Sequence, residues 1–312
     1  TGGSELDRSG LMPDLTVAIV SFNAKEELRA CLDSIFSATH LDSFEVIVAD
    51  NASTDGTVEM LRDGFPEVRR IASPENLGFS RGCNLCWREA KSSLVLFLNS
   101  DTVVPDRALD RLVAIARERP ETGAIGPRLL YPDGEIQMSF GAMLGIVSEL
   151  LQKLWNAGYA RGKGPLRSEV RRRYSRERFV DWVSAACLLT RRDTLETVSG
   201  FDENFFMYSE DVDLCARIRA TGARILFTPD VEIVHLVGRS RENNSDRVVY
   251  ESHRSRLYFY EKHHRSFEVL LLKLYMAVKA GVLRFLRPRD RALYARILHL
   301  TRAETGSRRS SL

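Results

Sequence analysis

The chain has 312 residues, of which 44% are hydrophobic and 28% are charged, a balance that is typical of globular proteins. This composition excludes an intrinsically disordered chain, a collagen-like repeat and a small disulfide-stapled domain, and a chain of this length can bury a large core. The formal net charge of +3 conceals an asymmetry, because residues 253–312 hold 14 Lys and Arg against 4 Asp and Glu, which leaves −7 for residues 1–252. A basic end favours an anionic partner such as a lipid surface or a nucleic acid.

The cysteine content and the apolar runs indicate the compartment. Five cysteines, an odd and scattered set, favour a reducing cytosol over an oxidising exterior. No apolar run reaches the length of a membrane span, and we expect no signal peptide. We expect residues 1–13 to be a disordered leader.

The first half of the chain alternates strand and helix patterns. Strands are predicted at Thr16–Ser21, Phe44–Ala49, Val68–Ala72 and Leu94–Leu98, and helices at Ala24–Ala38, Asp55–Leu61 and Ser80–Ala90. This alternation predicts an α/β fold in which a parallel sheet has helices on both faces. In such sheets ligands bind beyond the carboxyl ends of the strands, so the polar residues that follow each strand are the first candidates.

The pattern is looser beyond Gly123. We predict, in chain order, a helix at Met138–Trp155, a mobile basic loop at Arg161–Arg178, a strand-like segment at Phe179–Thr190, a helix at Glu210–Ala220 and a strand pair at Arg224–His235 that is broken at Pro229. The apolar segment Ser266–Leu286 is interrupted by Lys and Arg. It predicts an amphipathic helix that lies at a surface rather than one that crosses a membrane.

Asn99, Ser100 and Asp101 follow the most apolar of the predicted strands. A carboxylate at that position is costly to bury alone, so it should face a cleft or a cation. Mg²⁺ and Mn²⁺ prefer oxygen ligands and often bridge one or two carboxylates to the phosphates of a substrate. Taken alone, Asp101 is explained better as a helix cap, and the neighbouring loops make the cation the stronger explanation.

Two further loops have the residues that a nucleotide site needs. Residues 50–57 (DNASTDGT) end a strand with hydrogen-bonding side chains that can read a nucleobase and ribose, or that serve only as turn and helix-cap residues. Residues 76–84 (NLGFSRGCN) hold glycines that permit close backbone approach and Arg81, which could meet a diphosphate. The sequence has no GxGxxG and no GxxxxGKS/T motif, which argues against dinucleotide-dependent oxidoreductases and P-loop proteins.

An acidic cluster lies in the second half of the chain. Residues 201–213 (FDENFFMYSEDVD) hold five carboxylates beside four aromatic residues. Acids at the start of a helix are favoured by the macrodipole, so Glu210 and Asp213 have a structural explanation. Partial desolvation also raises the pKa of a carboxylate, which makes these acids candidate general bases. His235, at the end of a strand, would complete a mixed nitrogen and oxygen metal site if it lay near Asp101.

Six segments now identify a resemblance. They are VAIVSFN, VADNASTDGT, ENLGFSRGCN, LFLNSDT, GFDENFFMYSEDVDLCAR and IVHLVGRS, and they span about residues 16–241. Together they resemble the family 2 glycosyltransferases with the GT-A fold, in particular a bacterial rhamnosyltransferase-like branch. The resemblance implies a Rossmann-like, mostly parallel central sheet flanked by helices, with a C-terminal helical extension. It implies a GT-A domain at 14–250, divided into a nucleotide-binding half (14–122) and an acceptor-binding half (123–250), and a basic amphipathic helical tail at 251–312.

The resemblance also implies roles for single residues. Asp101 corresponds to the last acid of the family's DxD motif and would hold a divalent metal, Mn²⁺ or Mg²⁺, together with His235. Asn99 stands where that motif has its first acid. Asp211 corresponds to the catalytic base and is preceded by Glu210. The implied nucleotide-sugar site comprises Ser21, Asn23, Asp50, Asn76, Gly78, Arg81, Asn99 and Ser100, and the implied acceptor site comprises Trp182, Ser184, Ala185 and Tyr208.

The implied activity is that of an inverting, metal-dependent glycosyltransferase. Asp211 would remove the proton of an acceptor hydroxyl while the metal neutralises the departing nucleoside diphosphate. The donor would be a dTDP- or UDP-sugar, with transfer of L-rhamnose from dTDP-rhamnose as the best match. The acceptor would be a lipid-linked or polysaccharide glycan of the bacterial cell envelope.

The resemblance places the protein in the cytoplasm, on the inner face of the membrane. There Arg161–Arg178 and the basic tail would contact anionic headgroups. The alternative for the tail is a solvated charged helix that packs on the body or at the seam of a homodimer. No nucleic acid partner is expected, since the sequence shows no RNA- or DNA-binding motif.

Two other functions stay open. A nucleotidyltransferase shares the α/β nucleotide cleft, but it normally carries a glycine-rich loop with Arg or Lys after the first strand, and here residues 22–25 are FNAK. A non-catalytic binding or scaffold protein of GT-A shape is the other alternative. The presence of Asp101, Asp211 and His235 argues against it.

Overall fold

The structure, a computed structural model, describes residues 12–160, 165–236 and 246–302. Apart from residues 12 and 13, the expected leader lies outside the described residues. So do residues 237–240, which end the IVHLVGRS segment, and the last ten residues of the basic tail.

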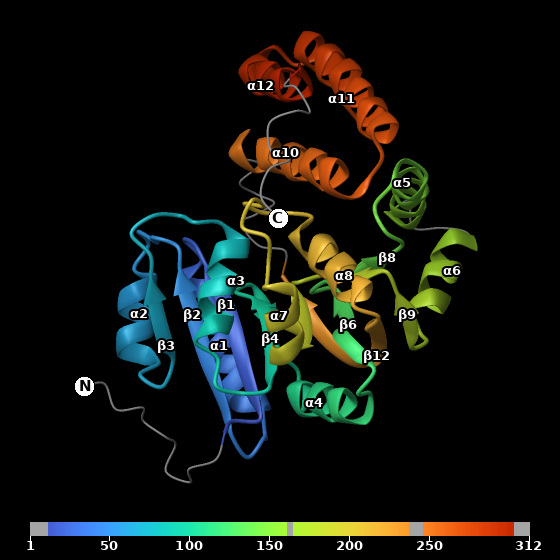
Figure 1. The fold of residues 1–312 in the computed structure, drawn as a ribbon. Helices are drawn as coiled ribbons and strands as arrows, with labels where there is room; N and C mark the ends of the chain where they lie inside the picture. The colour runs from blue at the N-terminus through green and yellow to red at the C-terminus, as the bar shows by residue number, and fades with distance from the viewer. Residues whose placement is uncertain (1–11, 161–164, 237–245, 303–312) are drawn as a thin grey trace.

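A central sheet of ten strands organises the chain (Figure 1). Its order is β3-β2-β1-β4-β11-β6-β12-β5, with β7 paired to β6 and β9 paired to β12. The strands are β1 (Leu15–Ser21), β2 (Phe44–Asp50), β3 (Arg69–Ala72), β4 (Leu94–Asn99), β5 (Thr102–Val103), β6 (Thr122–Leu130), β7 (Ile136–Gln137), β9 (Arg178–Val180), β11 (Cys187–Arg191) and β12 (Arg224–His235). Strands β1 to β4 are parallel, and β12 is parallel to β6, whereas β11 is antiparallel to both β4 and β6. This confirms the mostly parallel α/β sheet.

Helices cover both faces of the sheet. Helices α1 (Lys25–Ala38), α2 (Thr57–Gly64) and α4 (Ala108–Glu118) bury their apolar sides on one face, and α3 (Phe79–Arg88), α7 (Arg192–Val198) and α8 (Glu210–Ala220) on the other. In α1 the buried residues Leu28, Cys31, Leu32 and Ile35 follow the spacing of one helix face. β1 is buried almost throughout, which explains its continuous apolar sequence.

The predicted helix at Met138–Trp155 is wrong in its first part. Phe140–Gly141 forms strand β8, which pairs with β10 (Trp182–Val183), and helix α5 begins at Ile146 and ends at Ala160. The Ser139 N–H donates to the Tyr174 hydroxyl at 2.8 Å, and the Phe140 ring lies 4.3 Å from the Tyr174 ring. These contacts hold the segment extended, and they come from residues far away in the chain.

The predicted mobile loop at Arg161–Arg178 is also wrong over its described part. Pro165–Tyr174 forms helix α6, which ends just before β9. Val170 and Tyr174 are buried one turn apart, and they anchor the helix to the body. The Arg172 side chain donates to Glu169 at 2.6 Å, so part of the positive charge is paired on the helix itself.

Two strand predictions need correction as well. The segment Phe179–Thr190 is divided among β9, β10 and β11, because Ser184 turns the chain and donates its N–H to the Ser139 carbonyl at 2.8 Å. The segment Arg224–His235 is one strand rather than a pair. Its register against β6 shifts between Thr228 and Glu232, so Pro229 is accommodated in a bulge instead of ending the strand.

Three helices form the C-terminal extension, α10 (Asp246–His263), α11 (Ser266–Leu286) and α12 (Arg291–Arg302), with a short 3₁₀ helix, η1 (Pro288–Asp290), before the last of them (Figure 1). The helix predicted at Ser266–Leu286 is confirmed as α11, but it is not amphipathic in the expected way, because its exposed side is also rich in aliphatic residues. α10 crosses the boundary expected at residue 250, and the Ser255 hydroxyl donates to the Met207 carbonyl of the acidic cluster at 2.8 Å. Among the described helices, none has the combined length and hydropathy that crossing a bilayer requires.

Candidate active site

The carboxyl ends of β1, β2 and β4 bring three of the predicted groups together. Ser21 lies opposite Asp50 in the sheet register, and Val20 lies opposite Asn99. Asn23 joins the loops that follow β1 and β2, because its Oδ1 accepts the Thr54 N–H at 2.7 Å. The residues expected at the nucleotide therefore share one edge of the sheet.

Four buried side-chain oxygens at this edge lack a hydrogen-bond partner among the described residues. They are Ser21 Oγ, Asp50 Oδ1, Asn51 Oδ1 and Ser80 Oγ. The second oxygen of Asp50 accepts the Ser53 N–H at 3.0 Å, and the Asn51 amide donates to the Gly78 carbonyl at 3.0 Å, so both side chains are held in place. Buried polar atoms without partners are rare in folded proteins. Acceptors fixed in this way fit the N–H donors of a planar base.

Gly78 brings the loop before α3 close to the acidic cluster. Its φ of +84° lies in the region that favours glycine, and its N–H donates to the Asn76 side chain at 3.0 Å. A Cβ at this position would lie 2.4 Å from the Phe206 carbonyl oxygen. The next residue, Phe79, donates its N–H to the same oxygen at 2.7 Å. Only glycine permits this approach of two backbones.

We expect Gly78→Ala to lower the free energy of unfolding by about 2 kcal/mol or more, because it adds a steric clash to an unfavourable φ. Gly134→Ala is the matched control, since Gly134 also has a positive φ but no atom lies within 4 Å of its added Cβ. Urea unfolding of both variants makes the comparison. Equal losses in the two variants would show that the close approach to Phe206 adds nothing to the loss in the free energy of unfolding.

Arg81 lies on the outward side of α3. Its Nε is 3.5 Å from Glu203 Oε2, and about half of its side chain is exposed. The structure therefore brings Arg81 to the acidic cluster as well as to the loop of Gly78.

Asp101 and His235 meet, although 134 positions separate them in the chain. His235 Nε2 lies 3.1 Å from Asp101 Oδ1 and 3.3 Å from Asn99 Nδ2. On the other side of the ring, Nδ1 lies 2.8 Å from the Gln137 side-chain oxygen. If Nδ1–H donates to that oxygen, Nε2 turns its lone pair toward a carboxylate, a pair of donors that suits a cation between them. Ser100 occupies the turn between Asn99 and Asp101.

Asp211 stands in the first turn of α8 and is held by two backbone donors. The Val212 N–H donates to Oδ1 at 2.8 Å, and the Ala185 N–H donates to Oδ2 at 3.2 Å. Burial raises the pKa of this carboxyl, and the two backbone hydrogen bonds oppose that rise. The Asn99 N–H donates to the carbonyl of Ala186, the residue after Ala185, at 3.0 Å. The adjacent residues Ala185 and Ala186 therefore connect Asp211 with the segment that carries Asp101.

Glu210 differs from its neighbour in burial. It is a buried side chain whose Oε2 has no hydrogen-bond partner among the described residues. Burial first, and then the charge of Asp211, raise its pKa well above the usual range of a glutamate. Of the two acids, Asp211 is therefore the better candidate for an ionised base.

The four residues expected at the acceptor differ in exposure and in their contacts. Ser184 and Ala185 form the turn that carries the N–H donor to Asp211. Tyr208 is 39% exposed and has a φ of +69°, and it lies two residues before Glu210, where α8 begins. Trp182 is buried, with its indole N–H donated to the Ala142 carbonyl at 2.9 Å. Its side chain packs against Gly141 and offers no open surface to an acceptor.

The position of the acidic cluster depends on Asn84 of α3, which the motifs did not single out. Its amide donates to the Phe201 carbonyl and to Glu203, both at 2.9 Å, and its oxygen accepts the N–H groups of Phe201 and Trp87 at 2.9 Å. All of its hydrogen-bonding capacity is used. The signal in the sequence was a polar residue between two cysteines on a helix whose buried side is mostly apolar.

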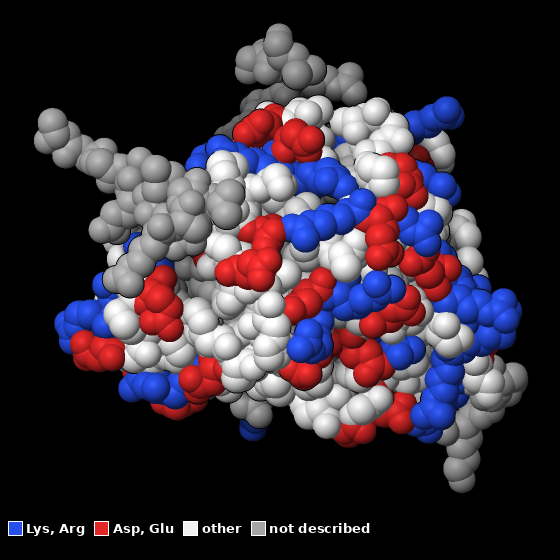
Figure 2. All heavy atoms as spheres, turned by 90° about the horizontal axis from the view of Figure 1, so that it is seen from below, with Lys and Arg blue, Asp and Glu red and all other residues white. Residues whose placement is uncertain are grey.

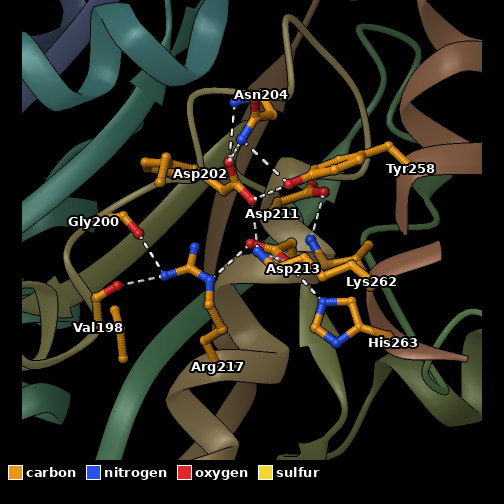
Figure 3. A network of polar contacts seen from close by, with 12 residues as sticks. Val198, Gly200, Asp202, Asn204, Asp211, Asp213, Arg217, Tyr258, Lys262 and His263 are labelled. Atoms are coloured by element: carbon orange, nitrogen blue, oxygen red, sulfur yellow. Dashed lines mark hydrogen bonds and ion pairs between the residues drawn. The ribbon is translucent and has the colours of Figure 1, made fainter. Parts of the chain in front are cut away.

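Asp213 forms the centre of a charged network that joins α8 to α10 (Figure 3). Its Oδ2 accepts the Arg217 Nε at 2.8 Å, and its Oδ1 lies 2.7 Å from both Lys262 Nζ and His263 Nε2. Burial alone would raise the pKa of Asp213, but the hydrogen bond with His263 and the charges of Arg217 and Lys262 outweigh it and lower the pKa to about 2. Asp213 opens the helix as expected, yet its partners come from the C-terminal extension.

The same lysine extends this network to the loop before α8. Lys262 Nζ also lies 2.7 Å from Asp202 Oδ2, which accepts the Tyr258 hydroxyl at 3.0 Å (Figure 3). Arg217 donates to the Val198 and Gly200 carbonyls at 2.6 and 2.7 Å. The acidic cluster thus has two parts, of which Asp202 and Asp213 are structural, and Asp211 faces the strand ends.

Comparison with known proteins supports one family for this arrangement. Residues 16–182, more than half of the chain, match the description "Glycosyl transferase family 2". The chain is 29% identical, over 80% of its own length and 85% of the relative's, to the N-acetylglucosaminyl-diphospho-decaprenol L-rhamnosyltransferase of Mycobacterium tuberculosis. It is also 29% identical to the O-antigen biosynthesis protein RfbC of Myxococcus xanthus, over 73% of this chain and 18% of that protein.

Solved structures with a similar fold include GalNAc-T7 with UDP, GalNAc and Mn²⁺, with a TM-score of 0.53 and 14% identity over 72% of this chain and 44% of the other. They also include TarS of S. aureus, with a TM-score of 0.53 and 16% identity over 86% of this chain and 43% of the other. At this identity the likeness concerns the fold alone, and it confirms the GT-A architecture. By its sequence match and its fold, the chain is a glycosyltransferase and belongs to family 2 of these enzymes.

Proposed function

We propose that this glycosyltransferase transfers L-rhamnose from dTDP-rhamnose to a hydroxyl of a lipid-linked glycan, with inversion at the anomeric carbon. The proposal rests above all on Asp211, a fixed and partly buried carboxylate. Ala185 binds Asp211 and the next residue, Ala186, binds Asn99, which lies beside the Asp101–His235 pair. The choice of sugar is supported by the printed function of the M. tuberculosis relative, which is similar over most of both chains.

The chemistry needs one base and one leaving group. Asp211 takes the proton of the acceptor hydroxyl as its oxygen attacks the anomeric carbon, and the bond from that carbon to the nucleoside diphosphate breaks. Attack from the face opposite the leaving group inverts the carbon, so no covalent intermediate with the protein forms. The orphaned oxygens of Asp50 and Asn51 accept hydrogen bonds from the base of the donor, and Arg81 neutralises part of the diphosphate charge.

A divalent cation, Mn²⁺ or Mg²⁺, fits the donor set at the strand ends. Asp101 and His235 would hold it as one oxygen and one nitrogen ligand, with Asn99 beside them. The described residues contain no group of three His, Cys, Asp or Glu side chains with the spacing of a metal site, so diphosphate oxygens and water would complete the coordination. When bound, the cation stabilises the negative charge that develops on the leaving diphosphate.

Asp101→Ala tests this assignment. We expect it to lower sugar transfer by at least about 100-fold and to remove the response to added Mn²⁺ or Mg²⁺, because a transition-state charge would lose its counterion. Asp106→Ala is the control, since Asp106 is an exposed carboxylate on the same segment that pairs only with His40 among the described contacts. Wild-type activity in EDTA would contradict the proposed metal dependence.

The acceptor side is proposed to work at the cytoplasmic face of the cell membrane. The M. tuberculosis relative is named for a sugar on a decaprenyl diphosphate, and a lipid-linked acceptor of that kind requires the enzyme to reach a membrane surface. We assign the nucleotide-binding half to 14–122, the acceptor-binding half to 123–250 and the membrane contact to the basic segment 251–312.

Release of nucleoside diphosphate from a panel of donors tests the whole proposal. The panel contains dTDP-rhamnose, UDP-glucose, UDP-GlcNAc, UDP-galactose and GDP-mannose, each with Mn²⁺, Mg²⁺ or EDTA and with a GlcNAc-diphospholipid acceptor. We expect metal-dependent release of dTDP from dTDP-rhamnose and a product with the opposite anomeric configuration by NMR. Transfer from a different donor would overturn the choice of sugar, and a retained configuration would overturn the in-line mechanism.

A further inference from the structure

Two helices from separate parts of the chain expose rows of aliphatic side chains. On α11, Leu270, Leu274 and Val278 follow one another at four-residue spacing, and each has at least 60% of its surface exposed. On α5, Leu150 and Leu154 have the same spacing and are each 59% exposed. Residues four apart lie on the same face of a helix, so each row is a continuous apolar ridge.

The exposed ridge of α11 is not the side that packs on the protein. Leu272, Met276 and Ala280 are buried, and they form the inner side of the helix against the rest of the C-terminal extension. α11 is therefore apolar on both its inner and its outer sides. A surface helix of a globular protein normally turns a polar side to water, and a contiguous exposed apolar patch marks an interaction site.

The two ridges belong to one surface. Lys153 of α5 lies with its Nζ 3.3 Å from the Tyr275 hydroxyl of α11 and 5.0 Å above its ring. α5 is also tied to α10, because Arg256 donates to Glu149 at 3.0 Å and the Tyr260 hydroxyl donates to the same carboxylate at 2.8 Å. Figure 1 shows α5 beside the first half of α11. We call the outer sides of α5 and α11 the α5–α11 surface.

Positive charge predominates in the segment that carries α11. Residues 266–302 contain eight Lys and Arg against two Asp and Glu, and Lys279, Arg284 and Arg287 are exposed along and just after α11. By contrast, the face seen from below in Figure 2 has blue and red side chains interspersed over most of its area. Aliphatic ridges bordered by cations match the interface of an anionic bilayer, where acyl chains lie beneath negative headgroups.

The charge pattern also argues against a second copy as the occupant. In a two-fold symmetric dimer the same surface faces itself, so the cations around α11 would oppose like charges. Since no described helix is suited to cross a bilayer, the fitting arrangement has both helices parallel to the membrane plane.

We propose that the α5–α11 surface docks on an anionic lipid bilayer, with the leucine ridges inserted among the acyl chains and the flanking cations at the headgroups. α10 connects this surface to the catalytic end, because it contacts Met207 and, through Lys262, both Asp202 and Asp213. The inference deepens the proposed function, and it rests on that function only for the lipid-linked nature of the acceptor.

Sedimentation with vesicles tests the surface. We expect the whole chain to bind vesicles that contain phosphatidylglycerol, and Leu270→Gln/Leu274→Gln to bind them at least about tenfold more weakly, because two aliphatic side chains no longer insert. Met12→Gln/Val58→Gln is the matched control, since it also removes two exposed apolar side chains but lies off this surface. Its binding should equal that of the wild type.

A second variant separates charge from insertion. Lys279→Glu/Arg284→Glu should weaken the preference for phosphatidylglycerol over pure phosphatidylcholine vesicles, because the net charge of residues 266–302 falls from +6 to +2. Equal binding of either double variant and the wild type would overturn the proposal. A dimer in lipid-free solution that Leu270→Gln/Leu274→Gln dissociates would overturn it too, in favour of a second copy.

Activity in the absence of membranes keeps the two proposals apart. Without vesicles, release of dTDP from dTDP-rhamnose with a short, water-soluble GlcNAc-diphosphate acceptor does not need the α5–α11 surface. We expect Leu270→Gln/Leu274→Gln to retain wild-type rates there. If the double variant keeps the wild-type rate and also binds vesicles like the wild type, the docking surface is rejected and the proposed function stands. If the wild type releases no dTDP but binds vesicles through the leucines, the proposed function is rejected and the docking surface stands.

Discussion

Replacing Asp211 by Asn is expected to lower kcat by about 1,000-fold, which is the usual contribution of a positioned general base. Asparagine keeps the shape of the side chain, and its oxygen can still accept the N–H of Ala185 or of Val212. The nucleotide cradle around Asp50 and Gly78 is untouched, so the affinity for dTDP should stay within about twofold of the wild type. Steady-state kinetics and calorimetric titration with dTDP measure the two quantities.

The pH dependence of the wild type gives an independent check. Because burial raises the pKa of Asp211, the acidic limb of the kcat/KM profile should lie above the ordinary aspartate value of about 4. The limb should disappear in Asp211→Asn. Asp230→Asn, a change at an exposed carboxylate on β12, is the control and should leave rate and profile unchanged. Wild-type turnover in Asp211→Asn would exclude this residue as the base.

Replacing Asp213 by Ala is expected to lower the free energy of unfolding by about 3–5 kcal/mol, because it leaves Arg217 and Lys262 near one another without their buried partner. The matched control is Glu196→Ala, which removes the acid of another i,i+4 pair, with Arg192, at an exposed site. That change should cost less than about 1 kcal/mol. Urea unfolding compares them, and similar losses in both variants would show that burial of the network carries no extra stability.

The stability of the wild type should depend on pH through the same residue. The pKa of Asp213 is lowered to about 2 in the folded chain, so its contribution is complete above the unfolded value of about 4 and is lost as the pH falls toward 2. The difference corresponds to about 2 kcal/mol. Asp213→Asn should lose that part of the pH dependence, and an unchanged slope between these pH values would contradict the assignment.

The sequence predicts a helix or strand correctly where the burial of that element follows a regular spacing of apolar residues. β1, α1, β2 and β4 appear within a few residues of their predicted bounds, because continuous burial on both faces of a strand and the three- and four-residue spacing on a helix are visible in the residues themselves. α11 was predicted with its observed bounds for the same reason. The four errors, at residues 138–145, 165–174, 179–190 and 224–235, fall where distant contacts outweigh the local pattern.

In the candidate site, too, one part could be predicted from the sequence and another part could not. The residue types at the strand ends were visible in the sequence, because carboxylates and amides directly after apolar strands are unusual and demand a reason. Their partners were not visible. Gln137 on β7 fixes the His235 ring, Ala185 holds Asp211 through its backbone N–H, and Asn84 fastens the acidic cluster to α3. None of these partners adjoins its target in the chain, and Ala185 contributes only a backbone group.

In this protein, local residue patterns are enough to predict the α/β order of the first half, the family and the polar residues at the strand ends. Only packing shows which acid of the 201–213 cluster faces the strand ends and which acids are structural. Asp211 and Asp213 stand two positions apart on α8, a separation that points their side chains to different sides of the helix. One side meets the turn between β10 and β11, and the other meets α10. The roles of these two acids therefore depend on which elements pack there, and packing is a property of the whole chain.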